Sequence, residues 1–141
     1  ENCFTRCMTL YADDAEMLVG SAYWLALTVA RTNSKNTQWR TFNFALDIGH
    51  HTGYCDGLAV LCEKSDAEEM YNRWIADDDT LNCSIVLYAL VVYHRLNGNE
   101  KKANEILDTL MNIDEFWAGF AYIAAWADRE QQKNIFTNAS V

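Results

Sequence analysis

Two long segments of this sequence, 15–31 and 80–96, are apolar on every side of a helix, and this pattern limits the folds open to the chain. They read AEMLVGSAYWLALTVAR and TLNCSIVLYALVVYHRL. A helix that is apolar all round is usually buried all round, so each segment needs other helices to cover it. The chain also contains no proline, the residue that helix interiors tolerate worst. We therefore expect an all-α protein.

Further helices are expected around these two. A helix over 37–48 is predicted because apolar side chains recur at spacings of three and four: Trp39, Phe42 and Leu46. Gly49 would end this helix. Another helix, over about 56–76, should be divided near Ser65 and Asp66, because Ser65 and Glu68 have the spacing of a capping box.

The 141 residues are expected to form one helical domain, 1–141. An amphipathic helix over 100–113 and a last helix capped by Asp114 complete a compact bundle of six or seven helices, with a helical hairpin in its C-terminal half. Residues 1–11 fit an extended arm or a short strand, and residues 131–141 fit a frayed tail.

The charge of the chain bears on the kind of partner it can have. Twenty acidic residues outweigh eleven basic ones, giving a net charge of −9. Direct nucleic-acid binding needs a basic footprint, and the one basic stretch without acids, 17–46, contains only Arg31, Lys35 and Arg40. We therefore expect a protein partner with a basic surface and no direct contact with nucleic acid.

The acidic residues are densest between 63 and 79. Seven acids stand there against two bases: Glu63, Asp66, Glu68, Glu69, Asp77, Asp78 and Asp79. One interpretation is a solvated helix face with helix caps. The other is a surface that imitates the phosphates of DNA or docks on an arginine-lined groove. The second leads to our main hypothesis, an acidic interaction module that acts as a mobile-element inhibitor or adaptor on a nucleic-acid-handling complex.

Aromatic residues indicate a second contact face. The chain has five tryptophans, and the last helix carries aromatic side chains on more than one face. One face can meet the core, whereas Trp117 and Trp126 would stay exposed unless a partner covers them. This face is also suited to pairing two copies of the chain as a homodimer.

The stretch DIGHHTGYCDG, 47–57, carries the alternative hypothesis, a small metal-dependent helical enzyme or sensor. His51, Cys55 and Asp56, together with His50, offer ligand types that bind transition metals. The competing interpretation is a corner between two helices, in which the glycines supply positive φ, Asp56 caps a helix and the histidines are solvated. We favour the corner and expect no metal or other cofactor. No nucleophile elbow or phosphate-binding loop points to an enzyme.

The five cysteines stand at 3, 7, 55, 62 and 83, with no CxxC pair. We expect free thiols in a cytoplasmic protein. An exported form, with Cys3 linked to Cys7 or either of them to Cys55, is the alternative. No apolar run reaches membrane-spanning length. The exported alternative includes a segment removed before Glu1. Two formal glycosylation sequons, which begin at Asn82 and Asn138, would also belong to it.

Residues 84–114 resemble a single helical hairpin of the tetratricopeptide type. The resemblance rests on these positions of the second helix: Gly98 at the turn, Ala103, Leu107, Leu110 and the closing Ile113-Asp114. Val91 stands where the family has a small residue, and Glu115 stands in place of its closing proline. The match covers about a fifth of the chain, and an array needs about three repeats. The resemblance implies protein binding without catalysis.

Overall fold

The computed structural model describes residues 1–113 and 118–138, with residues 132–138 described by their backbone alone. It is an all-α fold, as predicted, and the described residues contain no strand. Within the described ranges, seven α-helices and one 3-10 helix follow one another: α1 (Asn2–Leu10), α2 (Ala15–Thr32), η1 (Gln38–Thr41), α3 (Thr52–Leu61), α4 (Ala67–Ile75), α5 (Thr80–Leu96), α6 (Glu100–Met111) and α7 (Phe120–Asn138).

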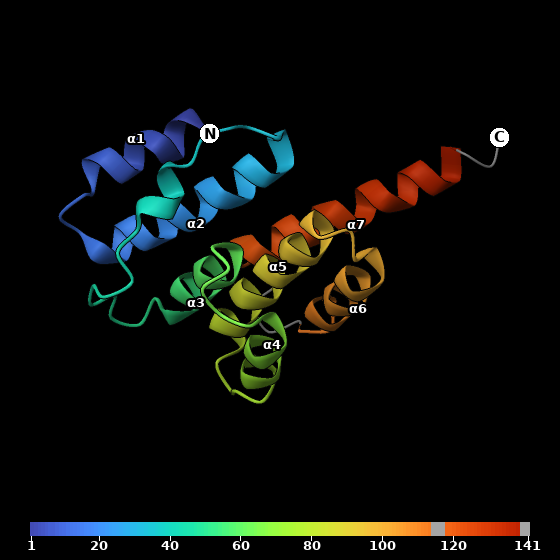
Figure 1. The fold of residues 1–141 in the computed structure, drawn as a ribbon. Helices are drawn as coiled ribbons and strands as arrows, with labels where there is room; N and C mark the ends of the chain where they lie inside the picture. Colours follow the sequence, from blue (N-terminus) through green and yellow to red (C-terminus); the bar gives the residue numbers. More distant parts are fainter. Residues whose placement is uncertain (114–117, 139–141) are drawn as a thin grey trace.

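The centre of the fold is α5, which is packed against α3, α4, α6, α7 and α2. Figure 1 shows it in the middle of the bundle, with α3 and α4 beside it and α6 and α7 on its other side. Every residue from Asn82 to Val92 is buried. The prediction that an all-round apolar helix is an all-round buried one is therefore confirmed for α5.

The second apolar helix, α2, is buried over its middle, from Val19 to Leu27, apart from half-buried Gly20 and Trp24. The Tyr23 side chain crosses to α5, where its hydroxyl donates to the Ile85 carbonyl at 2.7 Å. Gly57 of α3 makes room for this ring, because a Cβ there would meet it at 2.8 Å. The glycine thus permits close packing of α2, α3 and α5.

Two predicted elements differ from the structure. Residues 2–10 form α1, a helix and not an extended arm, and α1 is packed against α2. The helix predicted over 37–48 is reduced to η1 and a series of turns. Side-chain oxygens of Asn36, Asn43 and Asp47 each accept the backbone amide two residues ahead, and such bonds compete with a helix. Trp39 and Phe42 are nevertheless buried as expected, whereas Leu46, the third residue of the predicted apolar face, is exposed.

The helix boundaries are partly as predicted. The break after α3 is confirmed, but Asp66, not Ser65, caps α4 by accepting from the Glu69 amide at 2.8 Å. Asp79 caps α5 at the expected start. Asp114, the predicted cap of the last helix, lies outside the described residues. The helix continues to Asn138, through much of the tail expected to fray, and its second half extends beyond the other helices in Figure 1.

Candidate functional site

The acidic residues predicted to bind a partner lie at the two ends of α4. Glu63, Asp66, Glu68 and Glu69 occupy the turn before α4 and its first turn, and Asp77, Asp78 and Asp79 occupy the turn after it. All seven are exposed. The opposite face of α4 is held in the core by Met70 and Trp74, whose indole donates to Asp56 at 2.9 Å. This burial fixes the acidic face toward solvent.

Several of these carboxylates also have local structural roles. Asp66 and Asp79 are helix caps, and Asp77 accepts the amide of Asp79 at 2.9 Å. The bonds from Asn82 lower the pKa of Asp79. Glu68 pairs with Lys102 at 3.2 Å. The interpretation as helix caps therefore holds for Asp66 and Asp79, and Asp77 accepts its hydrogen bond in the turn between α4 and α5. Among the described residues, no such role is found for the carboxylates of Glu63, Glu69 and Asp78.

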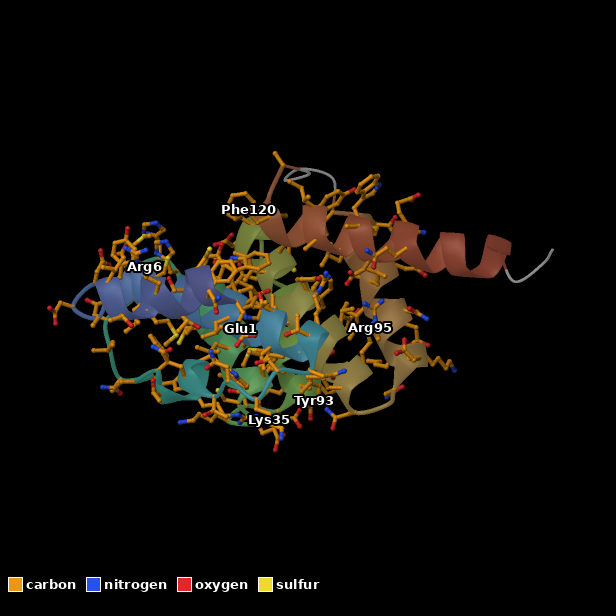
Figure 2. All side chains as sticks on the ribbon, turned by 90° about the horizontal axis from the view of Figure 1, so that it is seen from above. Glu1, Arg6, Lys35, Tyr93, Arg95 and Phe120 are labelled. Carbon is orange, nitrogen blue, oxygen red and sulfur yellow. The ribbon has the colours of Figure 1, made fainter. Side chains whose placement is uncertain are left out.

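Three of the predicted acids border one depression in the surface, which we call the acidic hollow. Its volume is about 650 Å³. Glu63, Asp66 and Glu68 form one side, and the other side comes from the end of α5. The full lining is Glu63, Lys64, Ser65, Asp66, Ala67, Glu68, Tyr93, His94 and Asn97. Tyr93, at the edge of the molecule in Figure 2, marks its position. Asp77, Asp78 and Asp79 lie apart from it.

Glu63 reaches the acidic hollow from an unusual backbone conformation. Its φ is +59°, in the left-handed region that favours glycine. The amides of Glu63 and Lys64 donate to the carbonyls of Val60 and Ala59, both at 2.9 Å, which is the Schellman pattern of a helix end. Glycine is the common residue at this position, so a glutamate here carries a conformational cost of about 1 kcal/mol.

The electrostatics of the acidic hollow combine both signs of charge. The last turn of α5 carries the partial negative charge of the helix dipole. The pKa of His94 is lowered, first by burial and then by the charge of Lys102, against an opposing effect of Glu68. A neutral His94 adds no positive charge near neutral pH. Lys64 holds its ammonium 4.7 Å from the centre of the Phe44 ring.

The predicted aromatic face is described only in part. Trp117 lies outside the described residues, and Trp126 is 54% exposed. Near Trp126, a groove of about 410 Å³ between α1, α2 and α7 is lined by apolar side chains alone: Phe4, Trp24, Phe120, Ile123, Ala124 and Ala127. Phe120, labelled in Figure 2, is 72% exposed. The use of this face for a partner or a second copy stays a prediction.

The structure separates the residues of the predicted metal corner. Asp56 lies inside α3, where its carboxylate accepts from Trp74 and pairs with Arg73 at 3.1 Å, so it is neither a cap nor grouped with His51. Cys55 lies beside it in α3, and burial raises the pKa of its thiol. His51 is the N-cap residue of α3. Gly49 has the expected positive φ of +54°, whereas Gly53 belongs to the helix.

The described residues bring a different set together around the paired histidines. One ligand atom from each of Glu16, His50 and His51 lies within 4.8 Å of the other two. Glu16 is in the first turn of α2, far from the histidines in sequence. Nothing in the spacing of the residues could have pointed to it, because the contact depends on how α2 and the segment before α3 meet.

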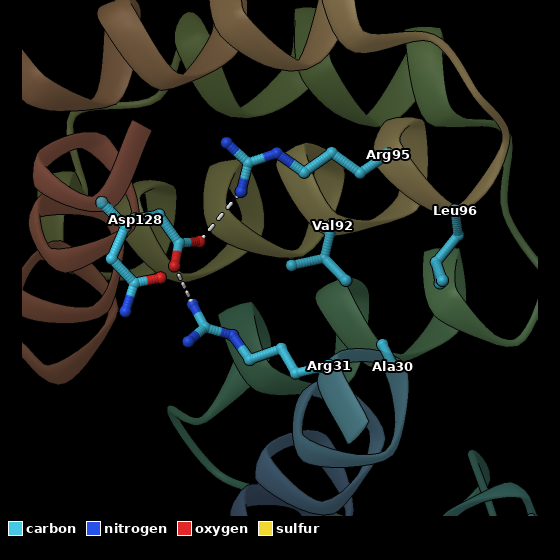
Figure 3. A pocket seen from close by; sticks show the side chains of 7 residues that line it. Ala30, Arg31, Val92, Arg95, Leu96 and Asp128 are labelled. Carbon is cyan, nitrogen blue, oxygen red and sulfur yellow. Dashed lines mark hydrogen bonds and ion pairs between the residues drawn. The ribbon is translucent and has the colours of Figure 1, made fainter. Parts of the chain in front are cut away.

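A charged cluster around the buried carboxylate of Asp128 was not predicted from the sequence. Asp128 of α7 pairs with Arg31 and Arg95, and the Tyr88 hydroxyl donates to the same carboxylate at 3.1 Å. Figure 3 shows both guanidinium groups pointing at Asp128 across a pocket of about 360 Å³. Burial, then the charge of Asp128, raises the pKa of Tyr88 well above its usual range. The cluster joins α2, α5 and α7.

A signal for this cluster was present in the sequence. Arg31 and Arg95 stand in the last turns of the two all-apolar helices, and Asp128 is the acid that interrupts the apolar run of α7. A buried carboxylate is rarely left unpaired, so an acid within an apolar run indicates a cationic partner, although the sequence does not say which residue it is. One atom departs from this pattern, since Nη2 of Arg95 is buried and has no hydrogen-bond partner among the described residues.

The structure shows the state of the cysteines and of Asn82, the asparagine of the first sequon. All five cysteines are free, and burial raises the pKa of Cys83 to about 11. Asn82 of the sequon is 8% exposed, and its Nδ2 donates to Asp79 at 2.7 Å and to the His50 carbonyl at 3.3 Å. In this fold its amide is already engaged, so attachment of a glycan would require local unfolding. The side chain of Asn138 is not described.

Comparison of the chain with protein-family models, with curated proteins and with solved structures finds no match. Over the described part of the chain, no helix combines the length and apolar character that a membrane crossing requires.

Proposed function

We propose that this protein is an interaction module that receives arginine or lysine side chains of a basic protein partner in the acidic hollow. The observation that carries the proposal is Glu63, which lies in a left-handed conformation at a helix end and lines the hollow. Glycine would fit that backbone at lower cost, so a role for the carboxylate itself explains the residue. Asp66 and Glu68 add two further carboxylates to the same wall.

The surroundings of the hollow favour a cation. The C-terminal end of α5 contributes the negative end of its dipole, and Tyr93 offers an aromatic ring on which a guanidinium can stack. Glu68 is shared with Lys102, and Lys64 is drawn toward Phe44. Among the described residues, neither Glu63 nor Asp66 has an ion-pair partner, so a partner's arginine would displace none there.

The wider charge distribution supports the same partner class. Segment 63–79 carries a net charge of −5, out of −9 for the whole chain. A field of this sign speeds association with a basic surface and repels nucleic acid. In its finer form, the proposal has the protein act as a mobile-element inhibitor or adaptor on a basic nucleic-acid-handling complex. The size and charge of the chain support that form.

The test is binding of a fluorescent oligo-arginine peptide, followed by anisotropy at two salt concentrations. Glu63→Gln combined with Glu68→Gln should weaken binding at least about tenfold. The matched control, Asp13→Asn combined with Glu105→Gln, removes the same charge from exposed residues outside the hollow. Equal weakening by both pairs would show that only the net charge matters and would refute the hollow as the site.

A further inference from the structure

We infer that Glu16, His50 and His51 form a binding site for a divalent first-row transition-metal ion of the zinc type. Each residue offers one ligand atom, and the three atoms lie within 4.8 Å of one another. In the part of the chain that the structure describes, no other group of three or more His, Cys, Asp or Glu residues meets this condition. The site is separate from the acidic hollow and does not depend on the proposed function.

The position of the histidines before α3 makes their approach possible. Adjacent side chains on a helix point about 100° apart, which would separate two imidazoles. Here Gly49 turns the chain with a φ of +54°, and His51 is the N-cap residue, so neither histidine is inside a helix. The two ring centres are 4.6 Å apart, with 33° between the ring planes.

The third ligand comes from α2. Oε2 of Glu16 lies 3.4 Å from Nδ1 of His51. Its other oxygen rests on the backbone of Gly49, where an added Cβ would lie only 2.6 Å from Oε1. The absence of a side chain at Gly49 therefore gives the carboxylate its place next to the histidines.

One atom of the group lacks the hydrogen bond that its burial calls for. Apart from its 3.4 Å ion-pair contact with Glu16, Nδ1 of His51 is buried and makes no hydrogen bond to the described residues. A buried polar atom without a partner is costly, and a metal ion bound there would remove that cost. The His51 ring is also held in orientation by stacking on Tyr54, at 6.1 Å between ring centres.

The donor set defines the class of ion. Two imidazole nitrogens and one carboxylate oxygen suit Zn²⁺, Ni²⁺ or Cu²⁺ better than Ca²⁺ or Mg²⁺, which prefer oxygen ligands alone. Three protein ligands also leave a fourth position of a tetrahedral zinc site for water. The expected site is an open one, at the junction of α2 and the segment that leads into α3.

The test uses ZnCl₂ in calorimetry and Co²⁺ as a spectroscopic probe on the reduced protein. We expect one ion per chain and a Co²⁺ spectrum without the intense thiolate band that cysteine ligands would give. Glu16→Gln, His50→Ala and His51→Ala should each weaken binding at least about tenfold. His94→Ala is the matched control, because His94 is the remaining histidine and lies at the end of α5.

Circular dichroism of each variant checks that it is folded, and Glu16→Gln is the decisive change because it keeps the shape of an exposed side chain. The inference is overturned if no ion binds at about 100 µM. It is also overturned if Glu16→Gln and His51→Ala bind as tightly as the unchanged chain, or if the Co²⁺ spectrum shows thiolate ligation.

Discussion

The amide of Gly53 donates to Oδ1 of Asn82 at 3.0 Å, and this bond joins the first turn of α3 to the first turn of α5. The two helices are so close here that a Cβ on Gly53 would lie 2.8 Å from the Asn82 carbonyl oxygen and 2.9 Å from its Cα. Backbone atoms cannot move aside as a flexible side chain can. The start of α3 therefore needs a glycine for space, although its φ is that of an ordinary helix residue.

Replacing Gly53 by alanine should consequently destabilise the protein by about 2 kcal/mol, because α3 must shift away from α5. Gly20 is the matched control. It also lies inside a helix, and a Cβ there meets nothing within 4 Å. Gly20→Ala should stabilise by about 0.5–1 kcal/mol through helix propensity. Urea unfolding measures both changes in stability. If both variants changed stability in the same direction, the packing described between α3 and α5 would be contradicted.

Glu63 gives a second prediction about stability. Glu63→Gly should raise the free energy of unfolding by about 1 kcal/mol, since glycine adopts a φ of +59° without strain. The same replacement at Glu69, inside α4, should lower it by about 1 kcal/mol. If Glu63→Gly destabilises the protein, the carboxylate contributes to folding, and its conformation is no longer a sign of function.

The contrast between Glu63 and Gly49 shows what the sequence could predict. The all-α fold, the span of α5 and the break before α4 followed from periodicity and capping residues. The positive φ of Gly49 could be predicted from its residue type. That of Glu63 could not, because the end of α3 sets the conformation of this residue. The helix expected at 37–48 does not form, because the side chains of Asn36, Asn43 and Asp47 make local turns. The spacing of apolar residues does not reveal such turns.

The candidate sites also combine features that the sequence predicts with features that only the packing of the helices determines. Exposed acids near α4 were predictable from the sequence, because seven acids stand between 63 and 79 and charged residues are mostly found at the surface. The acidic hollow required knowing that the end of α5 lies beside them. The pairing of Glu16 with His51, and of Arg31 with Asp128, joins residues far apart in the chain. Contacts of that kind depend on how the helices are packed, which one sequence does not reveal.

Stability should fall at alkaline pH. The folded protein raises the pKa of Cys83 to about 11 and raises those of Tyr23 and Tyr88 well above their usual values, in each case mainly by burial. Unfolded cysteine and tyrosine lose their protons near pH 8.5 and about 10. The unfolded state therefore releases protons first, so the stability from these neutral groups is present below about pH 8.5 and is lost as the pH rises.

This loss is measured by urea unfolding at a series of pH values between about 8 and 11. Cys83→Ala should reduce the slope of stability against pH by up to about 1.4 kcal/mol per pH unit above pH 9. Cys3→Ala is the control, because Cys3 is exposed. An unchanged slope in Cys83→Ala would contradict the burial of this thiol.

Asp128 should be important for the attachment of α7. Asp128→Asn removes the charge that pairs with Arg31 and Arg95, and we expect a loss of about 2 kcal/mol. Asp108→Asn, which removes an exposed pair with Arg129, should cost about 0.5 kcal/mol or less. Hydrogen exchange gives the location of the effect, since the amides of α7 should lose protection before those of α5. Uniform loss of protection would instead place Asp128 in the global core.

The most direct test of the proposed function is amide mapping by ¹H–¹⁵N NMR during titration with an oligo-arginine peptide. The account predicts that the largest shifts fall on the residues lining the acidic hollow, Glu63, Glu68, Tyr93 and His94. Residues around Asp13 and Asp47, which are exposed acids elsewhere, should move little. Shifts of equal size at all exposed acids, or the largest shifts away from the end of α5, would contradict it.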